Sequence, residues 1–168
     1  GMASNDNPIQ GERVTLIASA TDNLGIVNYA WRQVAGTEVT LIDANGVSAS
    51  FVAPNTTGLL QFVVRVTDTD GLQSEATVEV DVAGISPQAI VFDQTVAQQD
   101  GVILDGSAST DNIGIASYSW RQDSGSPVNL LGANTVIAGF VAPNTIGTLQ
   151  FSLVVTDTDG LQSSATVS

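Results

Sequence analysis

The stretch LQFVVRVTDTDGLQSEATVEV, residues 60–80, contains two alternating patterns separated by a short polar segment. Apolar residues occupy every second position from Leu60 to Val66 and again from Ala76 to Val80. One apolar face with a period of two is typical of a strand buried on one side. The segment between them, Asp68-Thr69-Asp70-Gly71, has the aspartate and glycine that tight turns favour. The stretch therefore predicts a β-hairpin that turns one face toward a hydrophobic core.

The chain contains this pattern twice. A shift of 89 residues aligns residues 21–78 with residues 110–167 without a gap, and 38 of the 58 aligned positions are identical. Such similarity indicates tandem duplication. We therefore expect two domains, residues 1–83 and 84–168, joined by a short linker near Ala83–Pro87.

The two ends of the chain differ from the repeated pattern. We interpret Gly1–Ser4 as a cloning remnant. The first copy continues through Glu79–Val82, whereas the second stops at Ser168. We therefore expect the last strand of the second domain to be cut short, as in a piece of a longer array.

Other segments of each repeat also alternate. Val14 and Leu16 lie on one expected inward face, and Trp31 on another; Val47, Ala49 and Phe51 form a third. No segment shows a sustained helical period. About seven short strands per repeat, separated by turn signals, predict an all-β fold of two tandem immunoglobulin-like β-sandwiches.

The order of motifs resembles the PKD-like family. The second copy runs VILDGSASTDNIGIASYSW (102–120), VNLLGANTVIAGFVAPNT (128–145) and LQFSLVVTDTDGLQSSATV (149–167). The Trp-Asp-Phe-Gly-Asp-Gly stretch frequent in that family is replaced by Trp-Arg-Gln, as in a divergent branch. The resemblance implies a non-catalytic module of a cell-surface or secreted protein, often with bound calcium.

The charge balance excludes several classes of partner. Seventeen acidic residues face four arginines, and the net charge is −13. Such a surface repels nucleic acid and anionic membranes and attracts cations. The chain has no cysteine and hence no disulfide framework. It also lacks an apolar run of roughly 20 residues, so we expect no membrane insertion.

Acidic and amide side chains gather in two loops of each repeat. In an immunoglobulin-like sandwich, the loop after the second strand and the loop of the predicted hairpin lie at the same end. Calcium takes six to eight oxygen ligands, so a cluster of carboxylates and an amide fits it. An aspartate-rich turn needs no metal, and the turn alone favours the simpler interpretation. The candidate ligands are Asp22, Asn23, Asp68 and Asp70 in the first copy, and Asp111, Asn112, Asp157 and Asp159 in the second.

Sugar binding on exposed aromatic side chains and enzymatic catalysis receive less support from the sequence. We expect Trp31 and Trp120 to lie in the core, as the tryptophan of such sandwiches does, rather than to form a sugar-stacking platform. Phe92 is the one aromatic residue without a counterpart in the other repeat. Without His, Cys or Lys, the usual catalytic bases and nucleophiles are missing, so we do not expect an enzyme.

These observations favour a calcium-stabilised spacer or adhesion module of a larger secreted or cell-surface protein. Its expected partners are the neighbouring domains of a longer array. The alternative is an accessory module of a secreted hydrolase that binds polysaccharide or protein. An exposed row of aromatic side chains or a deep groove would favour that alternative.

Overall fold

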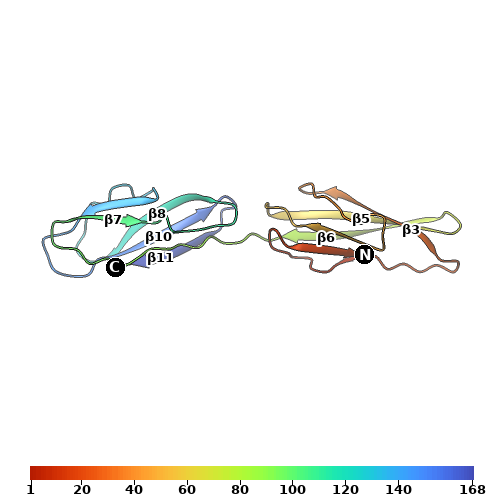
Figure 1. Ribbon diagram of the computed structural model, residues 1–168, viewed down its shortest axis with the longest axis horizontal. Coiled ribbons are helices and arrows are strands. Elements are labelled where there is room, and N and C mark those ends of the chain that lie inside the picture. The colour runs from red at the N-terminus through yellow and green to blue at the C-terminus, as the bar shows by residue number, and fades with distance from the viewer. The chain divides into compact units, whose positions relative to one another are not determined.

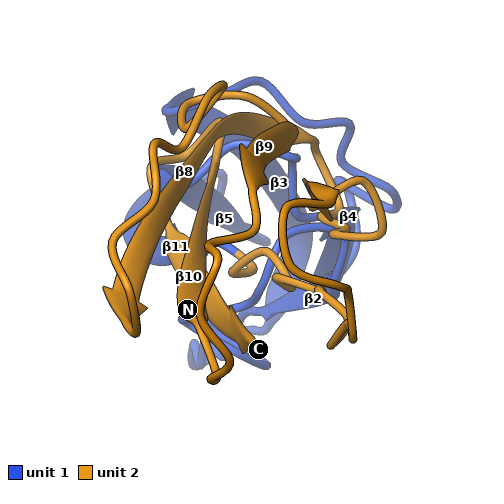
Figure 2. Ribbon diagram, turned by 90° about the vertical axis from the view of Figure 1, so that its left-hand side faces the viewer, with its two compact units in different colours: residues 1–84 blue, residues 85–168 orange.

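The computed structural model describes residues 1–168, and all of its regular elements are β-strands (Figure 1). The chain forms two compact units, Gly1–Gly84 and Ile85–Ser168, which Figure 2 shows in different colours. The predicted all-β class and the two tandem domains are confirmed. No helix in the structure is long and apolar enough to cross a membrane.

The first unit contains two three-stranded antiparallel sheets, with the orders β1-β2-β4 and β3-β5-β6. Its strands are β1 (Met2–Ala3), β2 (Arg13–Ile17), β3 (Ile26–Ala35), β4 (Ser48–Val52), β5 (Gly58–Asp68) and β6 (Gln73–Val82). The short β1 comes from the segment that we interpret as a cloning remnant, and Met2 pairs with Ile17 at the edge of the sheet.

The second unit repeats the arrangement with shorter sheets. One sheet has two strands, β7-β9, and the other has the order β11-β10-β8. The strands are β7 (Gly101–Asp105), β8 (Ile115–Ser124), β9 (Ile137–Val141), β10 (Gln150–Asp157) and β11 (Gln162–Val167). The units thus contain six and five strands rather than about seven. Some of the remaining segments pair through isolated bridges, such as Ile42 with Ser50 and Leu131 with Gly139.

A single core lies between the two sheets of each unit. In the first unit, the rings of Phe51 on β4 and Phe62 on β5 lie with their centroids 4.7 Å apart and tilted by 33°. In the second, Phe140 and Phe151 repeat this contact at 4.8 Å and 31°. Tilted aromatic pairs at this separation add to the stabilisation from apolar burial. The same contact therefore joins the two sheets in both units.

The alternation predicted for the strands agrees with their burial. On β10 every second side chain from Phe151 to Asp157 is buried. On β6, Val78, Val80 and Val82 are buried. The prediction for Val47 was wrong, because its side chain is 49% exposed. Val47 precedes the first residue of β4, so the pleat of the strand does not hold it on the inward face.

Both tryptophans lie in the core, as predicted. Trp31 is 5% exposed and Trp120 is 4% exposed. Each indole Nε1–H donates a hydrogen bond of 3.1 Å to a backbone carbonyl, of Gly46 and of Thr135 respectively. Each unit therefore buries one tryptophan with its polar atom satisfied, which supplies a separate fluorescence reporter for each unit.

Replacing Phe62 by alanine should lower the free energy of unfolding of the first unit by about 3–5 kcal/mol, because a fully buried ring is removed and a cavity remains. Urea unfolding followed by tryptophan fluorescence measures this in a Trp120→Phe background, where Trp31 is the one remaining tryptophan. Leu72→Ala, at a side chain that is 69% exposed, is the control and should change stability by less than about 0.5 kcal/mol. Equal effects of the two substitutions would contradict the core position of Phe62.

Candidate functional site

The two acidic loops of each unit lie at the same end of the sandwich, as the sequence predicts. In the first unit, Ile26 at the start of β3 pairs with Asp68 at the end of β5. The backbone N–H of Thr69 also donates to the carbonyl of Gly25 at 3.2 Å. In the second unit, Ile115 pairs with Asp157 in the same way. The antiparallel pairing of β3 with β5, and of β8 with β10, therefore brings loops that are distant in sequence together.

The first aspartate of each DTDG segment shapes its turn. Asp68 Oδ1 accepts hydrogen bonds from the backbone N–H groups of Asp70 and Leu72, both at 2.9 Å. Gly71 follows with a φ of 81°, a conformation that glycine adopts without a steric cost. This local arrangement requires no metal, so one oxygen of Asp68 has a purely structural role.

The second copy makes the same turn with nearly the same bonds. Asp157 Oδ1 accepts from the backbone N–H groups of Asp159 and Leu161, both at 2.8 Å, and Gly160 has a φ of 84°. The turn is therefore a property of the repeated sequence.

The aspartate of the other acidic loop, the one before β3 in the first unit and before β8 in the second, also caps backbone groups. Asp22 Oδ2 accepts from the N–H of Leu24 at 2.8 Å. Asp111 Oδ2 accepts from the N–H groups of Ile113 and Gly114, both at 2.8 Å. Such side-chain to backbone bonds are the usual reason for an aspartate in a loop. In both units, the carboxylates thus have one oxygen engaged within their own loop.

The remaining candidates are exposed or half-buried, and Asp22 is exposed as well. Asn23, Asp70 and Asn112 are exposed, and Asp159 is half-buried. When its amide nitrogen faces the carboxylate, Asn23 donates to Asp22 Oδ1 and Oδ2 at 3.1 and 3.2 Å. No three acidic side chains of the chain come together as a group that could hold a metal ion. The structure therefore does not assemble the predicted carboxylate clusters as complete ligand sets.

Asp157 differs from its counterpart Asp68 in burial. It is 2% exposed, whereas Asp68 is half-buried. Asp157 is the last residue of β10 and follows Phe151, Leu153 and Val155 on the inward face, so the strand directs its side chain toward the core. Its Oδ2 is buried and has no hydrogen-bond partner. Burial of an ionised carboxylate oxygen without a partner is costly.

A second bare oxygen, that is, a buried carboxylate oxygen without a hydrogen-bond partner, lies in the neighbouring loop. Asp111 Oδ1 is also buried without a hydrogen-bond partner. The backbone that Asp111 caps leads directly into Ile115, which pairs with Asp157. Asp111 Oδ1 and Asp157 Oδ2 are the only buried side-chain oxygens or nitrogens in the chain that lack a partner. Both occur at one end of the second unit.

The segment that leads into the second unit contacts one of its two acidic loops. Gln88 and Thr110, the residue before Asp111, form an isolated β-bridge. Each backbone N–H donates to the carbonyl of the other residue, at 2.8 and 3.0 Å. In the first unit, Asp22 and Asp68 line an open cavity of about 340 Å³. Solvent therefore reaches the carboxylates of the first unit more readily than those of the second.

The arginines that follow the tryptophans pair with acids on the surface. Arg32 and Arg65 both contact Glu75, at 3.4 and 2.9 Å, and the bond from Arg65 lowers the pKa of Glu75. Arg121 instead pairs with Asp123 at 2.8 Å. The hydroxyl of Ser152 donates to this carboxylate and lowers the pKa of Asp123. These groups are exposed, so their pairs contribute little to stability.

Comparison with known proteins gives one family for both units. The model of the family described as "K319L-like, PKD domain" matches residues 3–82 and 92–168. The rat "Dyslexia-associated protein KIAA0319 homolog" is 31% identical over 155 residues, which are 88% of this chain and 14% of the relative. The mouse "Dyslexia-associated protein KIAA0319-like protein" is 33% identical over 157 residues, 85% of this chain and 14% of the relative. The chain thus spans about one seventh of the length of these relatives.

A solved structure is similar to part of the chain. The solution structure of the PKD domain from KIAA 1837 protein is 28% identical, with a TM-score of 0.43, and covers 48% of this chain and 80% of that domain. The match of the family model over both units confirms the resemblance to the PKD-like family noted in the sequence.

Replacing Asp68 by alanine should lower the free energy of unfolding of the first unit by about 1–3 kcal/mol, because two backbone N–H groups lose their acceptor. Asp70→Ala is the matched control in the same turn and should change it by less than about 0.5 kcal/mol, since the Asp70 side chain is exposed. Urea unfolding in the presence of a chelator separates this structural role from any effect of metal. Equal losses for the two variants would refute it.

Proposed function

The chain belongs to the K319L-like PKD domain family, and we propose that it is a non-catalytic spacer or adhesion module of a larger extracellular protein, stabilised by calcium in its second unit. The observation that carries the calcium proposal is the bare, buried oxygen of Asp157. Asp111 supplies the second such oxygen in the adjacent loop. A hard divalent cation would neutralise both carboxylates, with other oxygens and water completing its shell.

The chemistry of these residues suits calcium better than a transition metal. The side chains at this end offer oxygen donors, and the chain contains neither histidine nor cysteine. Calcium accepts irregular sets of oxygen ligands that include backbone carbonyls. Asp157 Oδ1 and Asp111 Oδ2 are already held by backbone N–H groups. The turns would thus orient the two carboxylates, and little would have to reorganise when the ion binds.

A cation at this end would act on the segment that leads into the second unit. Thr110 precedes Asp111 and is bridged to Gln88 in that segment. Neutralising Asp111 would stabilise the loop that holds this bridge. Extracellular modules bind calcium with a Kd of about 10⁻⁴–10⁻³ M, so such a site would be occupied outside the cell. We therefore place the proposed function in an extracellular array, with neighbouring domains as its partners.

The alternative, an accessory module that binds polysaccharide or protein, lacks the exposed aromatic row that would favour it. Trp31, Trp120 and four of the five phenylalanines are buried, so they form no exposed stacking row. Phe92 is the exception, with 69% exposure. Polysaccharide binding that is lost in Phe92→Ala would favour this alternative.

Calcium should raise the thermal midpoint of the second unit by roughly 5–10 °C at ten times its Kd, because linkage then stabilises the fold by about 1.4 kcal/mol. A Trp31→Phe background leaves Trp120 as the reporter of the second unit. Asp157→Asn should abolish the shift, since it removes the charge of the bare oxygen and leaves a carbonyl to accept the turn bonds. Asp68→Asn, the matched change in the first unit, should preserve it.

Magnesium at equal concentration controls for general screening of the acidic surface. Identical thermal midpoints of the second unit with calcium and with chelator would contradict the calcium proposal. An equal shift with magnesium, or an undiminished shift in Asp157→Asn, would also overturn it.

A further inference from the structure

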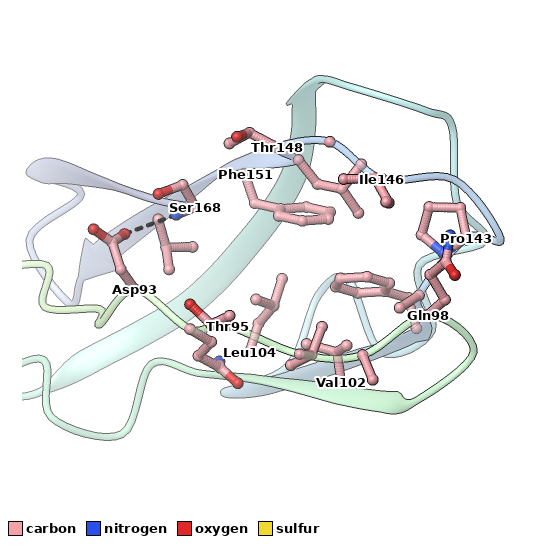
Figure 3. A pocket seen from close by; sticks show the side chains of 18 of the residues that line it. Asp93, Thr95, Gln98, Val102, Leu104, Pro143, Ile146, Thr148, Phe151 and Ser168 are labelled. Atoms are coloured by element: carbon pink, nitrogen blue, oxygen red, sulfur yellow. Dashed lines mark hydrogen bonds between the residues drawn. The ribbon is translucent and has the colours of Figure 1, made fainter.

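The sheet formed by β7 and β9 in the second unit has a core face and an outward face. Val102 and Leu104 of β7 lie on the side that faces Phe151 of the other sheet (Figure 3). Because side chains alternate along a strand, the residues between them turn outward. The outward positions on the two strands are Gly101, Ile103, Asp105, Ile137, Gly139 and Val141.

The outward face is largely apolar and open to solvent. Ile103 is 60% exposed, Ile137 48% and Val141 64%. Leu131, which bridges to Gly139 on the side of β9 away from β7, is 65% exposed. A hollow of about 650 Å³ lies over this face, and none of its lining residues is charged, although the chain has a net charge of −13. A contiguous exposed apolar surface of this kind marks an interaction site.

The matching face of the first unit is polar and carries its own cover. Thr15 and Ser50 pair there between β2 and β4, at the positions that Ile103 and Gly139 hold in the second unit. Arg13 Nη2 donates to Ser50 Oγ at 2.8 Å. A long charged side chain therefore lies across this face of the first unit, and Ser50 is only 8% exposed.

In the second unit the outward face sets aliphatic side chains opposite glycines. Ile103 on β7 pairs with Gly139 on β9, and Val141 on β9 pairs with Gly101 on β7. Each of these pairs has one projecting side chain and one hollow, and the projection changes strand from one pair to the next. A Cβ added at Gly101, the counterpart of Arg13, would meet no atom within 4 Å. The hollow above Gly101 is therefore open.

This arrangement is complementary to itself. A twofold axis parallel to the strands, above the face and midway between them, sets β7 of one copy over β9 of the other. Ile103 of each copy then lies over Gly139 of the other, and Val141 lies over Gly101. Sheets packed face to face keep their strand directions within about 30° of each other, so such a contact is centred on these two pairs.

Electrostatics also favours this face for a contact between two acidic chains. The lining of the hollow sets no carboxylate against another. Asp105 stands at the end of the face, where its Oδ1 accepts from the N–H of Ser107 in its own loop at 2.8 Å. Two copies can therefore meet at the centre of the face without placing like charges in direct contact.

We propose that the outward face of the β7-β9 sheet is a homotypic interface, at which a second copy of this chain docks with Ile103 and Val141 seated over Gly139 and Gly101. The inference adds a partner to the proposed adhesion role and does not depend on the cation. Strands of five residues extend for only about 17 Å. The contact is therefore smaller than the roughly 800 Å² per partner of stable complexes, and it gains strength where many copies are held together.

Sedimentation equilibrium tests the proposal at protein concentrations up to about 1 mM, because small interfaces bind weakly. The fraction of dimer should rise reversibly with concentration. Added sodium chloride should increase it further, since screening reduces the repulsion between two chains of net charge −13. Calcium and chelator should give equal dimer fractions, so the outcome is independent of the calcium proposal.

Two substitutions separate a fitted contact from general adhesiveness. Ile103→Thr, which introduces the residue of the first unit, should weaken dimerisation at least about tenfold, since an apolar side chain is lost from both copies. Gly101→Val fills the hollow and should also weaken it at least about tenfold, because Val141 of the other copy loses its space. Val27→Thr, at a side chain of the first unit that is 61% exposed, is the matched control and should leave the dimer unchanged.

The thermal midpoint of the second unit, followed by Trp120 fluorescence in the Trp31→Phe background, verifies that both variants fold. A chain that stays monomeric at the highest concentration would overturn the proposal. An undiminished dimer in Ile103→Thr, or a stronger one in Gly101→Val, would overturn it as well, because a nonspecific apolar surface would give that result. Loss of the dimer in Val27→Thr or in chelator would assign the contact to another surface.

Discussion

The contact between one phenylalanine from each sheet is the interaction on which the rest of each unit depends. Phe62 and Phe151 lie on the inward faces of β5 and β10, and each ring meets a partner from the opposite sheet. Because side chains alternate along a strand, placing these rings inward determines the direction of every later residue on the strand. Asp68 and Asp157 therefore also lie on the inward face, six residues farther along. The candidate cation site is a consequence of the core.

The two units make the same turn at carboxylates that differ in burial. Asp68 and Asp157 make the same turn with the same backbone donors. One faces an open cavity, whereas the other is buried with a bare oxygen. Duplication thus preserves the local hydrogen bonds of the turn.

The sequence by itself determined the strands, the duplication and the family, because alternation with a period of two and the order of turn residues are local properties. It also indicated that two acidic loops meet, since the order of strands in a sandwich places them at one end. The inward position predicted for Val47 was wrong, because β4 begins one residue later, at Ser48. Only the tertiary structure decided which carboxylate oxygens receive donors and which remain bare. That outcome depends on burial, and burial arises from residues far apart in the chain.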